Sequence, residues 1–175
     1  SKNQTQDQEI PSNIEAEQNL LGSVLVNNDI IDEIASIISS EKFYDPIHIK
    51  IYEVIENLNN KGMIANPITL KNYFEKNQGL DDVGGVEYLV KLTRFSSSVK
   101  QAIDYAKIVH ENYVKRELVK ISQLIKDDTL NIDEDKSSDT IIEDAEKLLF
   151  DLAERGSFSQ SFIKFNLALD QSISM

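Results

Sequence analysis

The sequence contains no cysteine, no tryptophan, only three prolines and only two histidines. Without cysteine, the chain can form neither a disulfide nor a thiolate metal site. It also lacks a run of about 18 apolar residues, the length that a membrane-spanning helix requires. Its first residues are polar, where a secretory signal would be apolar. We therefore expect a cytoplasmic protein without a membrane partner.

Basic side chains are scarce: 18 stand against 30 acidic ones, for a net charge of −12. Broad electrostatic binding to nucleic acid needs a basic surface, so this balance argues against it. Metal sites need three or four ligands, and we interpret the two isolated histidines, His48 and His110, as cap or surface residues. No group of residues has the spacing of a catalytic triad or of a general acid–base pair. The sequence predicts no catalytic, cofactor-binding or metal-binding residue.

What the sequence does contain is helical periodicity. Apolar residues recur at intervals of three and four along most of the chain, and no segment alternates as a strand would. The composition, 41% hydrophobic and 27% charged, is typical of a folded soluble domain. The predicted fold class is all-α, with helices expected within residues 13–26, 27–38, 46–61, 67–77, 84–92, 99–126 and 139–156.

Capping signals support these assignments. Ser12 and Glu15 have the spacing of a capping box, in which each side chain satisfies a backbone N–H at the helix start. Asp45 and Asn66 each precede a proline, and this order suits an N-cap followed by the first helical residue. Gly62 suits the left-handed position that follows a helix.

The last two helices carry opposite charges. Residues 91–126 have 8 basic and 3 acidic side chains (net +5), and residues 127–155 have 3 basic and 11 acidic ones (net −8). An antiparallel hairpin would pair these charges, which we favour over binding of nucleic acid by the basic helix. Two helices alone bury little, so a hairpin with an apolar seam is expected to self-associate. The predicted seam consists of Val114, Leu118, Ile121, Ile125, Ile141, Ala145, Leu148 and Leu152.

Two local sequences approach the pattern of ligand-binding loops. Gly84 and Gly85 lack the preceding strand and the Gly-Lys-Ser/Thr of a phosphate-binding loop, and two aspartates come just before them. We interpret this pair as a structural turn. The acidic residues at 133–144 lack the glycine and the final glutamate of a calcium loop, and a solvated interhelical loop is favoured. The alternative of a small acid-rich hydrolase would require metal binding there.

Several stretches, taken in order, resemble one family: PSNIEAEQNLLGSVL, FYDPIHIKIYEVIENLNNKG, ITLKNYFEK, DVGGVEYLVKL and DYAKIVHENYVKRELVKI. Over residues 11–155 the series is similar to the N-terminal domain of bacterial replicative DNA helicases of the DnaB type. Gln101 departs from the family, which often has Asn there. The resemblance implies a disordered tail over residues 1–11, a globular helical head over 12–97, a helical hairpin over 98–156 and a linker helix within 157–175.

The resemblance also implies a longer protein. In this family a motor domain follows the linker, binds DNA, ATP and Mg, and unwinds duplex DNA in the 5′ to 3′ direction. The chain is then a piece of a helicase without ATPase activity or a cofactor of its own. It would assemble as dimers and as a trimer of dimers, and would dock primase, with a helicase loader as a further candidate partner. The linker would dock on a neighbouring motor through Phe162, Phe165 and Leu169.

A rival interpretation comes from a different class of protein. A stand-alone all-α adaptor, or a protein like a helicase loader, would bind a replication partner without belonging to a helicase. A reading frame that continues past Met175 into a phosphate-binding loop would distinguish the two.

Overall fold

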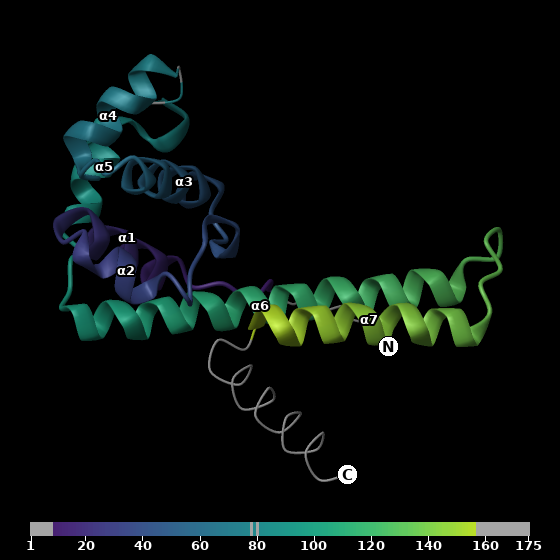
Figure 1. Cartoon of the computed structure of the whole chain (residues 1–175). Coiled ribbons are helices and arrows are strands. Elements are labelled where there is room, and N and C mark those ends of the chain that lie inside the picture. Colours follow the sequence, from purple (N-terminus) through teal and green to yellow (C-terminus); the bar gives the residue numbers. More distant parts are fainter. Residues whose placement is uncertain (1–8, 78, 80, 157–175) are drawn as a thin grey trace, which may run out of the picture. The chain divides into compact units, whose positions relative to one another are not determined.

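The computed structural model describes residues 9–77, 79 and 81–156, and every regular element in them is a helix, so the all-α prediction is confirmed (Figure 1). The chain divides into two compact units, with the boundary between Tyr113 and Val114, inside the longest helix. None of the helices in these ranges combines the length and the apolar character that a bilayer crossing demands. The elements are α1 (Ile14–Val26), α2 (Asp29–Ile34), the 3-10 turn η1 (Ser40–Lys42), α3 (Pro46–Asn60), α4 (Pro67–Lys76), the 3-10 turn η2 (Asp81–Val83), α5 (Gly85–Thr93), α6 (Val99–Leu130) and α7 (Ser138–Gly156).

The start of α1 differs from the prediction by one residue. Asn13 is the N-cap, and its Oδ1 accepts a hydrogen bond from the Ala16 N–H at 2.9 Å. The predicted capping box of Ser12 and Glu15 is therefore wrong. Asparagine and serine are equally good caps, so the sequence offered two adjacent candidates, and the helix begins after the second.

Asp45 and Asn66 cap α3 and α4 as predicted. Asp45 Oδ1 accepts the N–H two residues further on at 2.9 Å, and Asn66 forms a reciprocal capping box with the threonine three residues further on. Gly62, which follows α3, has the predicted left-handed backbone, with a φ of 71°. Asn28 is the N-cap residue of α2, but its side chain makes no capping hydrogen bond; its amide instead bonds the backbone N–H and C=O of Ala65, both at 2.8 Å.

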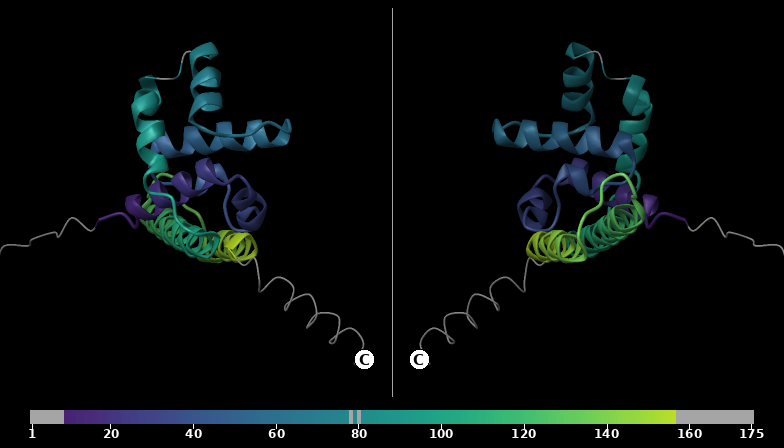
Figure 2. Two further views of the ribbon diagram at one scale, coloured as in Figure 1. Left: turned by 90° about the vertical axis from the view of Figure 1, so that its left-hand side faces the viewer. Right: turned by 90° about the vertical axis from the view of Figure 1, so that its right-hand side faces the viewer.

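The first unit, which ends at Tyr113 and is called the head below, packs around α3. In Figures 1 and 2, α3 lies between α4 on one side and α1 and α2 on the other, with α5 beside them. The first half of α6 adds Ala102, Ala106 and Val109 to the same apolar core. The largest fully buried side chains are Tyr52, Phe43, Leu20, Leu21, Ile30, Ile34, Ile51, Ile55, Leu70, Leu89, Leu92 and His48.

Gly22 allows α1 to approach the end of α5. A Cβ at this position would lie 2.0 Å from the carbonyl oxygen of Leu92 and 3.0 Å from its carbonyl carbon. Both are backbone atoms, which cannot rotate away as the end of a side chain would. The next residue, Ser23, accepts the N–H of Ser97 on its hydroxyl at 2.9 Å, just before α6 begins. The contact therefore fixes the position where the chain turns into α6.

We expect Gly22→Ala to destabilise the head by about 3 kcal/mol, because the added methyl group overlaps the backbone of Leu92. In an ordinary helix interior the same exchange stabilises by about 1 kcal/mol, so the sign is reversed here. Gly156→Ala is the control, since its Cβ would meet Val114 Cγ2 at an ordinary 3.5 Å. Thermal unfolding followed by circular dichroism compares the two. An unchanged midpoint for Gly22→Ala would contradict this close packing.

A polar network is buried inside the head, where α1, α3 and α5 meet. Glu17 is 1% exposed, and its carboxylate accepts the N–H of Tyr44 at 2.8 Å and that of Asp45 at 3.2 Å. Its Oε1 also accepts a hydrogen bond from His48 Nδ1 at 2.8 Å, because an ionised carboxylate can only accept. The prediction that the histidines lie on the surface is wrong, since His48 and His110 are both buried.

Tyr88 of α5 completes this network. The Tyr88 hydroxyl oxygen lies 2.6 Å from His48 Nε2, within hydrogen-bonding distance. Gln18 donates to the same hydroxyl oxygen at 3.3 Å. Burial raises the pKa of Tyr88; the Gln18 bond opposes the rise, while the charges of Asp45 and Glu17 add to it. The phenol thus keeps its proton, and the network links three helices through paired polar groups.

Candidate assembly surface on the helical hairpin

The second unit is a hairpin of two helices. The part of α6 that begins at Val114 lies beside α7 in each view (Figures 1 and 2). A Cβ on Gly156 would lie 3.5 Å from Val114 Cγ2, so the end of α7 meets the beginning of this part of α6, and the helices are antiparallel. At the loop, Lys136 pairs with Asp128 of α6 at 3.1 Å and with Asp144 of α7 at 3.8 Å. The hydrogen bond to Asp128 raises the pKa of Lys136, so the cation that ties the helix ends together stays charged.

The eight residues of the predicted seam differ in burial. Ile121 and Leu152 are buried, and they mark where the hairpin closes on itself. Val114, Ile141 and Ala145 are partly exposed. The side chains of Leu118, Ile125 and Leu148 are 37–44% exposed. Much of the seam is therefore accessible in a single copy of the chain.

Further apolar side chains are exposed beside this seam. Ile142 and Leu149 are 55% and 43% exposed, and their spacing of seven residues places them on one face of α7. They directly follow Ile141 and Leu148 in the sequence, so the apolar face of α7 is wider than a single stripe. A face of this width is typical of a helix that packs against more than one partner. Ile142 and Leu149 follow the same helical spacing as the seam residues. The prediction missed them because it selected only one stripe of that pattern.

The glycine pair lies at the start of α5. Gly84 and Gly85 have positive φ angles of 82° and 71°. A Cβ on Gly84 would lie 3.0 Å from Cβ of Tyr88, so a side chain there would be both strained and crowded. Asp81 and Asp82, just before the pair, are exposed. The assignment of the pair to a structural turn stays a prediction.

Two further predictions concern a metal site in the acidic loop at 133–144 and a docking surface on the linker. Among residues 9–77, 79 and 81–156, no three histidine, aspartate or glutamate side chains are placed to hold a metal ion. The acidic loop at 133–144 instead holds Lys136 between the two helix ends. The three linker residues predicted to dock on a motor domain lie outside the described residues: Phe162, Phe165 and Leu169.

The fold defines a class of protein, an all-α domain made of a helical head and a helical hairpin. The family model for the "DnaB-like helicase N terminal domain" matches residues 9–111, more than half of the chain. The chain belongs to this family, and the resemblance predicted from the sequence is confirmed.

Curated relatives agree with this assignment. The replicative DNA helicase DnaB of Rickettsia bellii is 39% identical over 164 residues, which cover 94% of this chain and 33% of the relative. That of Rickettsia conorii is 37% identical with the same coverage, and that of Pasteurella multocida is 29% identical over 149 residues. The chain therefore spans about a third of the length of the curated relatives that it matches. These matches give the alternative of a stand-alone adaptor no support.

Solved structures have the same fold. The N-terminal domain of DnaB helicase from Mycobacterium tuberculosis matches with a TM-score of 0.73 and 25% identity, over 82% of this chain and 99% of that one. A DnaB-like replicative helicase, described with its interactions with primase, matches with a TM-score of 0.65 over 90% of this chain and 35% of that one. At 22% identity, this second likeness shows the fold alone.

Proposed function

We propose that this chain is the assembly domain of a hexameric replicative DNA helicase and pairs through the exposed apolar face of its hairpin. The observation that carries the proposal is burial: of the eight seam residues, only Ile121 and Leu152 are buried. Exposed apolar faces of this kind mark interaction sites, and two more helices would complete a four-helix bundle. A second copy supplies that pair, and three such dimers form the hexamer.

The charges of the two helices support pairing between copies. Residues 114–126 of α6 have 4 basic and 1 acidic side chains, a net charge of +3. Residues 138–156 of α7 have 2 basic and 6 acidic ones, a net charge of −4. In a symmetric pair, α6 of one copy lies against α7 of the other, and opposite charges at the rim of the contact favour this register.

We further propose that the whole protein is an ATP-dependent helicase that unwinds duplex DNA in the 5′ to 3′ direction. Its motor, a separate domain of the longer protein, would bind DNA, ATP and Mg. The support is the membership of the family and the likeness to replicative helicases three times as long. Primase is the proposed partner of this domain, by analogy with the helicase whose structure is described with its interactions with primase. A helicase loader is a further candidate partner on the family resemblance alone.

Light scattering across a range of concentrations tests the pairing. We expect the 175-residue chain to have the mass of a dimer, or of a hexamer built from dimers. Addition of primase from the same organism should then give a species of the combined mass. A strict monomer even at high concentration would contradict pairing through the hairpin. The apolar seam would then be satisfied within one chain.

A further inference from the structure

The head has a hollow of about 280 Å³ between α2, η1 and α3. One wall is apolar and is made by Ile31, Ala35 and Ile38. The other walls are polar and come from η1 and from one face of α3. The lining residues on these walls are Ser39, Tyr52, Glu56, Asn59 and Asn60.

Tyr52 is the most deeply buried polar group in this hollow. Its side chain is 1% exposed, and its ring packs against Phe43 with a centroid separation of 5.1 Å. Its hydroxyl forms no side-chain hydrogen bond with another described residue, and it is not among the fully buried, unpartnered polar atoms, so the small exposed part of Tyr52 includes the hydroxyl that lines this hollow. Burial raises the pKa of Tyr52, and the charge of Glu56 raises it further. The phenol is therefore protonated, with both its proton and its lone pairs available to a ligand.

The carboxylates around the hollow have no ion-pair partner among the described residues. Burial raises the pKa of the Glu56 carboxyl, and the charges of Glu41 and Glu53 raise it further, while the nearby backbone of Ser40 opposes the rise. Within the described ranges, Glu41, Glu53 and Glu56 form no ion pair with a lysine or arginine. A raised pKa means that the charged form of Glu56 is disfavoured in the free protein. A cation supplied from outside would relieve this penalty.

A neighbouring hollow extends the acidic surface around α3. It has a volume of about 390 Å³ and is lined by Glu53, Glu56, Asn57, Asn60 and Lys61. Lys61 is at its edge but is not ion-paired with either glutamate, as far as the described residues extend. The two hollows share Glu56 and Asn60 and therefore form one continuous surface.

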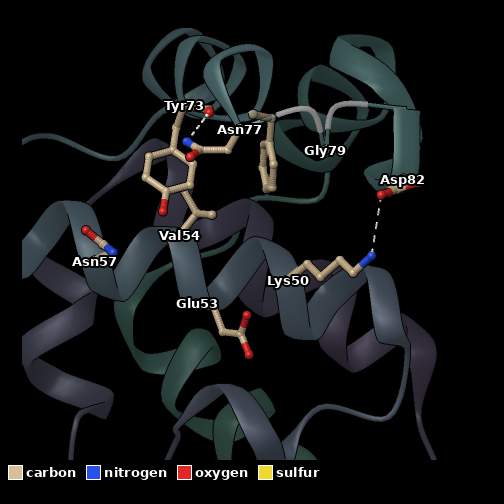
Figure 3. A pocket seen from close by; sticks show the side chains of 9 residues that line it. Lys50, Glu53, Val54, Asn57, Tyr73, Asn77, Gly79 and Asp82 are labelled. Carbon is tan, nitrogen blue, oxygen red and sulfur yellow. Dashed lines mark hydrogen bonds and ion pairs between the residues drawn. The ribbon is translucent and has the colours of Figure 1, made fainter.

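A third hollow, on the α4 side of α3, is different. It has a volume of about 350 Å³, and Figure 3 shows Lys50 reaching across it to Asp82, at 3.7 Å. Val54 of α3 and Tyr73 of α4 also line it, from its two sides (Figure 3). Asp82 in this hollow is already paired with Lys50 of the same chain. The third hollow therefore does not need a positively charged ligand in the way that the hollow beside Glu56 does.

We propose that the hollow beside Tyr52 is a socket for one arginine side chain presented by a basic segment of a partner protein. The arginine stem would pack on the apolar wall, while its guanidinium donates to the Glu56 carboxylate and to the Tyr52 hydroxyl oxygen. Guanidinium offers five donors and no acceptor, which matches a site rich in carboxylate, hydroxyl and amide oxygens. The socket belongs to the head and does not depend on pairing of the hairpin.

Nuclear magnetic resonance of the ¹⁵N-labelled chain tests the socket, with the peptide acetyl-Ala-Ala-Arg-Ala-Ala-amide as the probe. As the peptide is added, we expect the amide chemical shifts of Ala35, Ser39 and Asn59, which line the hollow, to change until the site is saturated. The same peptide with citrulline in place of arginine keeps the shape and loses the charge, and it should produce no such shifts. A third peptide carries lysine in place of arginine. Equal binding of either the citrulline or the lysine peptide would overturn the assignment to arginine.

Two variants separate binding from folding. Glu56→Gln should weaken the arginine peptide about tenfold, the size of a hydrogen bond to a charged group, while its thermal midpoint at pH 7 stays equal or rises. Tyr52→Phe should also weaken binding without lowering the midpoint, because the hydroxyl it removes has no partner in the described chain. Glu75→Gln, an equal charge change on α4, is the matched control. If Glu56→Gln lost no more affinity for the arginine peptide than Glu75→Gln does, the proposal would be overturned.

Discussion

Leu148→Asp should leave the chain monomeric at concentrations where the unchanged sequence is paired. In one copy Leu148 is 37% exposed, and it lies on the face of α7 that we propose a second copy covers. Pairing of the variant would bury a carboxylate among apolar side chains. An uncompensated buried charge costs about 3 kcal/mol or more, which corresponds to an association at least about 100-fold weaker. Sedimentation equilibrium on both proteins gives the two dissociation constants.

Ile132→Asp is the matched control for this prediction. Ile132 lies in the loop between α6 and α7 and is 92% exposed, so its replacement adds the same charge to the hairpin without altering the seam. We expect its dissociation constant to be unchanged, and circular dichroism should show the same helix content in all three proteins. Equal dissociation of both variants would assign the effect to net charge. Undisturbed pairing of Leu148→Asp would place the interface elsewhere.

The helices are predictable from the sequence because their signals are local. Asp45 and Asn66 act on backbone N–H groups within three residues, and Gly62 acts on its own φ angle. The end of α6 at Leu130, four residues beyond the predicted end, has an equally local reason. The polar residues there suggest a break, but without glycine or proline nothing stops a helix from continuing through them.

Contacts between distant segments are not predictable in this way. Gly22 meets Leu92, and His48 lies between Glu17 and Tyr88, so each contact joins helices that are far apart in the sequence. A histidine at the start of a helix has the same local sequence whether the tertiary structure covers it or not.

The apolar seam is an intermediate case. The spacing of its residues follows from the helical period, but which of them the hairpin itself covers depends on how closely α6 and α7 approach. For the same reason the sequence did not distinguish Leu152, which is buried, from Leu148, which is partly open to solvent. The acidic side chains around Tyr52 are visible in the sequence, whereas the hollow that gathers them forms only when α2 and α3 pack.

Glu17→Ala should lower the free energy of unfolding of the head by about 3–5 kcal/mol, the cost of removing one partner from a buried charged network. The carboxylate accepts three hydrogen bonds, and the substitution leaves the N–H groups of Tyr44 and Asp45 and the Nδ1–H of His48 without their acceptor inside the core. Urea unfolding followed by circular dichroism measures the loss. Hydrogen exchange provides a local measurement, because the amides of Tyr44 and Asp45 should exchange faster.

Two further variants show what the carboxylate contributes. Glu17→Gln retains one oxygen acceptor, so its free energy of unfolding should lie between that of the unchanged sequence and that of Glu17→Ala. Glu15→Ala removes the same charge from an exposed position of α1 and should cost less than about 1 kcal/mol. If Glu17→Ala cost no more than Glu15→Ala, desolvation of the carboxylate would cancel its hydrogen bonds. Apolar packing alone would then hold α1, α3 and α5 together, and the buried network would determine only how they are aligned.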